Sequence, residues 1–290
     1  MSRLGIFVDR KTLSSAEQLN ALIRCRDTAE EMGHGAEFIF PVDIRKIPQM
    51  DGLFIRARTD PMNVTYVASR MASFAGIPVI DDPSSIQICS DKVNMYSCLM
   101  QHGVKIPRTI FVSQRAFSPE RAREIFEDLG SPLIVKEPST SFSLRVEKVT
   151  DPAGLVQVAR RYFKMSDWIV AQEFVESTYD WRVGVLGGKF LYACKYIIPS
   201  QTFKIQDSVN GHIVYCGVQS VPPDLVPADV RELGVAAGKA IGKGLYGVDI
   251  KEGRAGPCVI EVNDNPSLEG GEDTAYPGVY REIVHTLLET

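Results

Sequence analysis

Two short stretches near the C-terminal end decide the fold of this chain: Gly247-Val248-Asp249-Ile250 and Val259-Ile260-Glu261-Val262-Asn263. Each stretch is rich in β-forming residues and carries an acid at an otherwise apolar position. Side chains alternate across a strand, so Glu261 and Asn263 share one face. The short connection between the two stretches predicts that they pair, which would place Asp249 on that face beside Glu261.

A shared face for these side chains raises an electrostatic problem. Neighbouring carboxylates repel each other and resist burial. A hard divalent cation removes the conflict, and the all-oxygen set of Asp249, Glu261 and Asn263 suits Mg²⁺, with Mn²⁺ as an alternative. The other interpretation is two ordinary exposed acids at strand ends, and the segment alone supports both interpretations equally.

Length and composition set the broad class. The chain has 290 residues, enough for two or three compact lobes, and is 44% hydrophobic and 23% charged, as in ordinary globular proteins. A net charge of −4 predicts no general attraction to nucleic acid or to an anionic membrane. The six scattered cysteines form no C-x-x-C pair, and no apolar run reaches the roughly 18 residues of a membrane span. We therefore expect reduced thiols and a cytoplasmic protein that binds neither nucleic acid nor membrane.

Apolar runs and helical patterns alternate over the first 80 or so residues. A helix is expected between Ser14, with Glu17 completing a capping box, and Gly33, and a second over residues 64–74. The intervening strands are expected at residues 4–8, 37–40, 53–55 and 77–80. This rhythm predicts a small open parallel sheet with helices on its faces, as an N-terminal domain over residues 1–82.

The middle of the chain reads as a connecting helix followed by a separate lobe. Over residues 83–107, Ser90 is expected to cap a helix that Gly103 ends. Residues 108–175 follow the order strand, helix, strand, strand, helix, strand. Its helices are expected to start at Ser118-Pro119 and Asp151-Pro152, each a capping residue followed by proline.

The C-terminal part, residues 176–290, favours antiparallel strands. Gly187-Gly188 predicts a two-residue hairpin turn. A long helix is expected over residues 227–242 and a last one over residues 279–288. Residues 234–240 resemble a Walker loop, but they are one residue short, have alanine where a hydroxyl should bind Mg²⁺, and lie inside a helical pattern.

Two lysines lie at positions from which they could bind a nucleotide phosphate. Lys136 ends a strand just before the hydroxyl-rich residues 139–143, whose hydroxyl and N–H groups suit an anion. Taken singly, a lysine snorkelling from an edge strand is the favoured interpretation. Lys92 stands at a helix start, where anions are favoured, so its side chain is more useful reaching for a bound phosphate.

Residues 168–176 form an apolar strand that leaves one lobe for the next. Backbone groups of such a hinge can pair with a purine edge, while Ile169, Val170 and Phe174 could supply apolar walls. A plain core strand is the favoured interpretation when the segment is taken alone.

The order of these pieces resembles the ATP-grasp superfamily, and specifically the RimK-like carboxylate–amine ligases. The resemblance runs from about Ile80 to the end, and the N-terminal α/β lobe fits the usual preceding domain. It is carried by Asp91-Lys92, Ile134-Val135-Lys136, Gln172-Glu173-Phe174-Val175-Glu176, Asp180-Trp181-Arg182, Gly247-Val248-Asp249 and the stretch from Glu261 to Glu269. The resemblance implies an α/β fold in which an N-terminal parallel domain precedes an ATP-grasp fold, with a central lid lobe and a C-terminal catalytic lobe.

The resemblance also implies roles, residue by residue. Lys92 and Lys136 would contact ATP phosphates, Lys136 also lying near the adenine, and Ser141 would belong to the loop over the phosphates. The hinge residues Gln172, Glu173, Phe174 and Val175 would present the adenine site, and Asp180 would hydrogen-bond the ribose. Arg182 and Lys195 would point toward the γ-phosphate as catalytic residues, and Asp249, Glu261 and Asn263 would be the Mg²⁺ ligands.

The chain departs from the family pattern in two places. Residues 139–143 are rich in hydroxyls where many members have glycines. No arginine stands just before Asp249, so an oxyanion would be stabilised by Arg182, Lys195, or a residue such as Lys204 or Gln206.

The implied reaction joins a small-molecule or peptide carboxylate to an amine through an acyl phosphate, with release of ADP and phosphate. The rival hypotheses are an ATP-grasp phosphotransferase that acts on a hydroxyl, and an ATP-binding regulatory module without turnover. A homodimer or homotetramer is what the family suggests.

Overall fold

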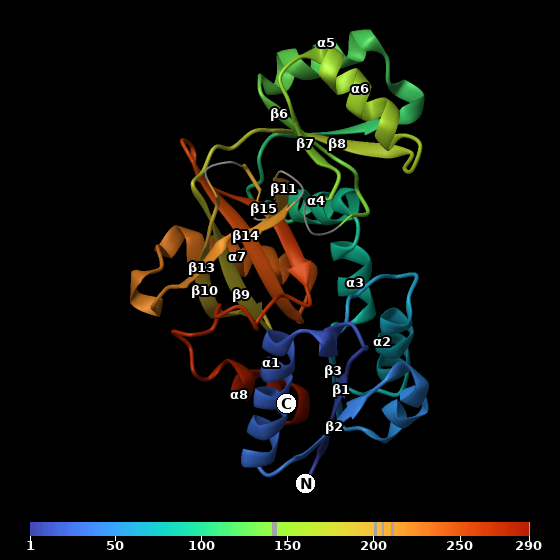
Figure 1. Cartoon of the computed structure of the whole chain (residues 1–290), viewed down its shortest axis with the longest axis vertical. Helices are drawn as coiled ribbons and strands as arrows, with labels where there is room; N and C mark the ends of the chain where they lie inside the picture. Colours follow the sequence, from blue (N-terminus) through green and yellow to red (C-terminus); the bar gives the residue numbers. More distant parts are fainter. Residues whose placement is uncertain (141–143, 200–201, 205, 210–211, 290) are drawn as a thin grey trace.

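The computed structural model describes residues 1–140, 144–199, 202–204, 206–209 and 212–289, and the side chains of residues 206–209 and 212–215 lie outside that description. Figure 1 shows the N-terminal elements at one end of the long axis, the central lobe at the other and the large C-terminal sheet between them. In the described ranges no helix is long and apolar enough to cross a membrane.

The N-terminal part is the predicted parallel sheet, with the strand order β2-β1-β3-β4. Its strands are β1 (Arg3–Phe7), β2 (Gly35–Ile39), β3 (Gly52–Ile55) and β4 (Val79–Ile80), and its elements of helix are η1 (Thr12–Ser14), α1 (Ala16–Glu31), η2 (Pro41–Gln49) and α2 (Val64–Phe74). The expected cap of α1 is wrong by one residue. Ser15, not Ser14, accepts a hydrogen bond from the Gln18 N–H, because Ser14 still belongs to the preceding turn.

Two helices connect this sheet to the rest of the chain, α3 (Pro83–Cys89) and α4 (Lys92–Gln101). The cap of α4 also differs from the expectation. Asp91, not Ser90, accepts from the N–H groups of Val93 and Asn94, at 2.9 and 3.0 Å. The carboxylate thus satisfies two N–H donors at the end of the helix where a negative charge is favoured.

The central lobe is a four-stranded antiparallel sheet of order β5-β8-β6-β7, covered by two helices. Its elements are β5 (Thr109–Ser113), η3 (Gln114–Ala116), α5 (Pro119–Leu129), β6 (Leu133–Lys136), β7 (Val146–Val149), α6 (Pro152–Tyr162) and β8 (Trp168–Glu173). Both predicted caps are confirmed: Ser118 accepts from the Arg121 N–H and Asp151 from the Gly154 N–H. The lobe has its own apolar core, in which Ile125, Leu155 and Ile169 are fully buried.

The C-terminal part is built on a five-stranded antiparallel sheet of order β13-β10-β9-β14-β15. Its elements are β9 (Tyr179–Leu186), β10 (Lys189–Ile197), β13 (Gly217–Ser220), η4 (Pro223–Leu225), α7 (Ala228–Ile241), β14 (Leu245–Gly253) and β15 (Gly256–Asp264), and β11 (Gln206–Val209) pairs with β12 (His212–Tyr215) separately. The predicted turn at Gly187-Gly188 is confirmed, with positive φ at both glycines.

Helix α7 explains the glycines that imitate a Walker loop. A Cβ at Gly234 or Gly238 would lie 2.6 Å from the Val183 or Val185 side chain, respectively. These valines belong to β9, so the glycines allow the helix to pack closely on the sheet. The spacing of the glycines therefore reflects packing.

The last helix, α8 (Val279–Leu288), packs chiefly against α1 and the N-terminal sheet, although residues 176–290 were expected to form one C-terminal lobe. Figure 1 shows it beside α1 at the N-terminal end of the molecule. Its apolar face, including Ile283 and Leu287, shares a buried cluster with Leu4 and Ile6 of β1. Thus the end of the chain returns to cover the first sheet.

Candidate active site

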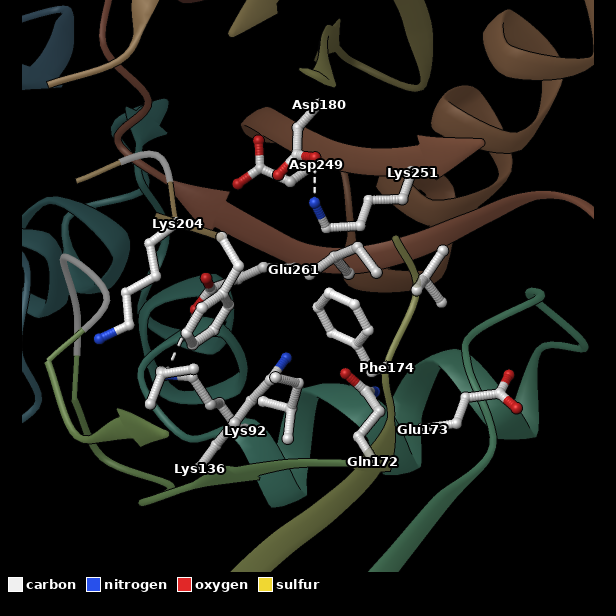
Figure 2. Close-up of a pocket in the computed structure, with 15 residues that line it drawn as sticks. Lys92, Lys136, Gln172, Glu173, Phe174, Asp180, Lys204, Asp249, Lys251 and Glu261 are labelled. Carbon is white, nitrogen blue, oxygen red and sulfur yellow. Dashed lines mark hydrogen bonds and ion pairs between the residues drawn. The ribbon is translucent and has the colours of Figure 1, made fainter. Parts of the chain in front are cut away.

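A cleft lies between the central sheet and the C-terminal sheet. Figure 2 shows its side chains converging from strands of both sheets and from α4. Including its open mouth, the cleft encloses about 730 Å³ that no protein atom fills. It is lined by Lys92, Ile134, Lys136, Val146, Gln172, Glu173, Phe174, Val175, Asp180, Phe203, Lys204, Asp249, Lys251, Ile260 and Glu261.

Three oxygen-bearing side chains meet on β14 and β15, as the alternation of the sequence predicts. Asp249 stands directly opposite Glu261 in the strand register, and Gly247 stands opposite Asn263. The Asn263 amide lies 3.1 Å from Asp249 Oδ2. No group of three His, Cys, Asp or Glu residues in the described part of the chain could hold a metal. The side-chain oxygen of Asn263 is therefore the candidate for a third donor beside Asp249 and Glu261.

Asp249 is also half of a buried ion pair. Arg182 Nε lies 2.6 Å from Asp249 Oδ1, Arg182 Nη2 lies 3.0 Å from Oδ2, and each side chain is only 6% exposed. Burial raises the pKa of Asp249, and the guanidinium opposes that shift. A carboxylate oxygen has two acceptor positions, so Asp249 can bond Arg182 and still accept a cation. Two carboxylates and an amide oxygen thus fit Mg²⁺.

Two lysines reach the same end of the cleft from different elements. Lys92 Nζ lies 3.3 Å from Glu261 Oε1 and donates to the Thr140 carbonyl. Lys136, at the end of β6, is buried, and burial lowers its pKa to about 8. Burial alone would raise the pKa of Glu261, but Lys92 and Lys136 outweigh it and lower that pKa. The cleft therefore holds cationic groups beside the oxygen donors.

The predicted hinge, residues 172–175, also lines the cleft. The Glu173 side chain points away from the cavity, where its Oε2 lies 2.8 Å from Arg108 Nε. Gln172 is held by Thr109 at 2.9 Å, and the Phe174 ring packs edge-on against Phe203 at a centroid distance of 6.2 Å. The hinge thus turns an aromatic ring, and not a carboxylate, toward the cavity.

Asp180 reaches the cleft with a partner that sequence reasoning missed. Lys251 Nζ lies 2.5 Å from Asp180 Oδ1. Burial raises the pKa of Asp180 to about 6, against the opposing effect of Lys251. Lys251 follows Asp249 by two residues on β14, so strand alternation could have placed it on the same face.

Lys195 does not join this cluster, contrary to the expectation that it points with Arg182 toward the γ-phosphate. Lys195 stands opposite Trp181, so it lies on the other face of the sheet, with its ammonium 4.1 Å from the centre of the Tyr179 ring. The cause is an irregularity between Phe190 and Tyr192, which shifts the pairing of β10 with β9 by one residue. A one-residue shift reverses the face of every later side chain.

Of the other expected residues, Lys204 lines the cleft. Arg182 lies behind Asp249, where its guanidinium stacks 4.9 Å from the centre of the Tyr196 ring. Ser141 lies outside the described residues, and the Gln206 side chain lies outside the description too.

The fold matches solved ATP-grasp enzymes along its whole length. A D-alanine–D-alanine ligase from Bacillus anthracis superposes with a TM-score of 0.73 at 18% identity, covering 100% of this chain and 97% of that one. A related structure of that enzyme, complexed with ATP, gives 0.72 at 19% identity over the same shares. The D-cycloserine synthetase DcsG gives 0.75 at 15% identity, covering 99% of each chain. The chain therefore has the α/β ATP-grasp fold.

Comparison of the sequence with known proteins identifies the family within the ATP-grasp fold. The model of the RimK-like ATP-grasp domain matches residues 89–287, and the chain belongs to this family of ATP-dependent ligases. A protein of Vibrio vulnificus named "Probable alpha-L-glutamate ligase" is 25% identical over 90% of this chain and 88% of its own length. A protein of the same name from Thioalkalivibrio sulfidiphilus is 29% identical over 74% of this chain and 68% of its own length.

Proposed function

We propose that this chain is a carboxylate–amine ligase, which activates a carboxylate with ATP and forms an amide bond through an acyl phosphate. The observation that carries the proposal is the composition of the cleft: its wall combines the cationic Lys92 and Lys136, close to Glu261, with an aromatic ring, Phe174. A triphosphate needs cations at one end of its site, and a base needs an apolar wall at the other.

In this proposal each group of side chains has one task. Lys92 and Lys136 donate hydrogen bonds to phosphate oxygens. Asp180 binds the ribose, and residues 172–175 hold the adenine. Asp249, Glu261 and Asn263 hold a divalent cation, which when bound offsets the charge of the phosphates. Arg182 fixes the orientation of Asp249 through its two hydrogen bonds. The protein thus supplies positioning and charge compensation.

The proposed reaction has two steps. A carboxylate oxygen of the first substrate attacks the γ-phosphorus, and the bond from this phosphorus to the oxygen bridging to ADP breaks. The amine nitrogen of the second substrate then attacks the acyl carbon, the carbon–oxygen bond to phosphate breaks, and the nitrogen loses a proton. Lys204, at the cleft wall, is the candidate for stabilising the oxyanion. Enclosure between the two sheets would limit hydrolysis of the acyl phosphate.

We further propose that one substrate is an acidic amino acid or peptide, as the names of the glutamate ligase relatives suggest. Arg10, Lys11 and Arg58 support this, since they lie just beyond the carboxyl ends of β1 and β3. In open parallel sheets, ligands bind at that edge. All three are exposed, and none forms an ion pair within the described part of the chain.

The loops that carry these cations are fastened to the strand that bears Asn263. The Thr12 hydroxyl donates to the Arg56 carbonyl at 3.0 Å, which joins the two cationic loops. Arg56 Nη1 then donates to Asn265 Oδ1 at 2.6 Å, and the Asn265 amide donates to the Ala57 carbonyl at 2.8 Å. Since Asn265 follows Asn263 by two residues, an anion held by the cationic loops would lie near the reacting end of ATP.

The test is ADP release by the purified protein with Mg²⁺ and pairs of acids and amines, with mass detection of the product. Pairs that contain L-glutamate should exceed matched pairs that contain L-glutamine. Hydroxylamine in place of the amine should yield a hydroxamate, because only an acyl phosphate gives this product. ADP release with a phosphorylated hydroxyl product and no hydroxamate would instead establish a phosphotransferase.

Glu261→Gln tests the proposed cation site within the same assay. The substitution should lower turnover at least a hundredfold, because it removes a charged oxygen donor. Glu37→Gln is the matched control, since Glu37 is also partly exposed, at 29% against 31%, and lies 3.1 Å from a lysine, Lys46. Full turnover in Glu261→Gln would contradict the assignment of the ligands.

A further inference from the structure

Tyr96 is a fully buried tyrosine on α4, one helical turn after Lys92. Residues four apart lie on the same side of a helix, so α4 directs both side chains toward the cleft. The ring packs in the core of the C-terminal lobe with Met95, Leu99 and Val170. Ring burial accounts for an aromatic residue here, but a phenylalanine would fill the same space without a hydroxyl.

The Tyr96 hydroxyl joins two strands that belong to different sheets. It donates its proton to the Ile260 carbonyl of β15 at 2.6 Å. Its oxygen accepts from Lys136 Nζ, at the end of β6, also at 2.6 Å. The Gln172 side-chain oxygen lies farther away, at 3.5 Å. Since a hydroxyl has one proton and two acceptor positions, donation to Ile260 leaves the oxygen free to accept from the lysine.

Within the described part of the chain, the Tyr96 hydroxyl is the only hydrogen-bond partner of the Lys136 ammonium. The residue is 5% exposed, and within the described part of the chain no carboxylate lies within 4 Å of its ammonium. An ammonium has three N–H donors, so one bond to Tyr96 leaves two for an anion in the cleft. A buried cation without a carboxylate partner is suited to a ligand that brings its own negative charge.

We propose that Tyr96 is a positioning residue that holds the Lys136 ammonium in place for the phosphates of the nucleotide. The Ile260 carbonyl precedes Glu261, so the hydroxyl fixes Lys136 relative to the strand that carries the oxygen donors. The inference rests on the proposed contact between Lys136 and ATP. It concerns the direction of the ammonium, since Tyr96 itself would touch no atom of the nucleotide.

The test is nucleotide binding by the full-length protein, measured by calorimetry with Mg²⁺ and the non-hydrolysable analogue adenosine 5′-(β,γ-imido)triphosphate, and repeated with adenosine. Tyr96→Phe should weaken binding of the analogue at least fivefold and change that of adenosine less than twofold, because only the analogue has phosphates. Tyr246→Phe is the control. Tyr246 is another fully buried tyrosine, and its hydroxyl bonds Ser85 and the Gly244 N–H away from the cleft.

A second variant keeps the inference testable if Tyr96→Phe perturbs the fold. Lys136→Met removes the ammonium that Tyr96 orients, so adding Tyr96→Phe to it should change the affinity for the analogue less than twofold. Equal losses for the analogue and adenosine, or a further fivefold loss in the double variant, would overturn the role of Tyr96. Failure of the unaltered protein to bind the analogue would instead refute the proposed use of ATP.

Discussion

Asp249→Asn and Glu261→Gln should differ sharply in stability, although both remove a charged oxygen from the proposed cation site. Asp249 balances the buried guanidinium of Arg182. Removing one partner of a buried ion pair costs about 3–5 kcal/mol. Glu261 is 31% exposed and lies 3.3 Å from Lys92, whose buried ammonium also donates to the Thr140 carbonyl, so losing this partly exposed pair costs only about 1 kcal/mol. At about 2–4 °C per kcal/mol, Asp249→Asn should lower the melting temperature by roughly 6–20 °C and Glu261→Gln by at most about 4 °C.

The assay is thermal unfolding followed by circular dichroism, in buffer without nucleotide or divalent cation, so that only the bonds within the chain differ. The double variant Arg182→Met/Asp249→Asn should recover part of the lost stability, because it removes the uncompensated charge. Equal melting temperatures for Asp249→Asn and Glu261→Gln would refute the reasoning, because the buried Arg182 pair would then contribute no more than the Lys92 pair. A marked loss in Glu261→Gln alone would refute it as well.

Two further predictions test the packing of the C-terminal sheet. Lys195→Ala should keep turnover within twofold in the ADP-release assay, because Lys195 lies on the face of the sheet away from the cleft. A tenfold loss of turnover would show that Lys195 acts in the site after all. Gly238→Ala should cost about 1–3 kcal/mol of unfolding free energy in a denaturant titration, because its Cβ would lie 2.6 Å from Val185. An unchanged midpoint would show that α7 can move outward without loss.

Local signals in the sequence predicted most of the elements. The helix starts at Ser118 and Asp151 were predictable because a cap and the following proline act within one turn. The position of α8 could not be predicted in this way, because its partners in β1 are about 280 residues away in the chain. An apolar stripe shows that a helix is covered on one side, but it does not show by what.

The same distinction holds for the cleft. Asp249 and Glu261 were correctly placed side by side, because β14 and β15 form a hairpin and their pairing is local. The family resemblance placed Lys195 beside Arg182, and a hairpin continued without interruption from the Gly187-Gly188 turn would agree, because it would pair Lys195 with Asp180. The irregularity after Phe190 pairs it with Trp181 instead. No feature of the sequence marks that irregularity, so the face on which Lys195 lies could not be predicted from the sequence.

Helix α4 accounts for the fixed spacing between groups that come from different sheets. Lys92, at its start, contacts both Glu261 and the Thr140 carbonyl that follows β6. Tyr96, one turn later, bonds both Lys136 and the strand that carries Glu261. Through Lys92 and Tyr96, helix α4 therefore connects the central sheet to the C-terminal sheet twice within about 6 Å of its length. A substitution that unwound this single turn would release both lysines from the oxygen donors together, whereas a substitution within either sheet would release only its own side.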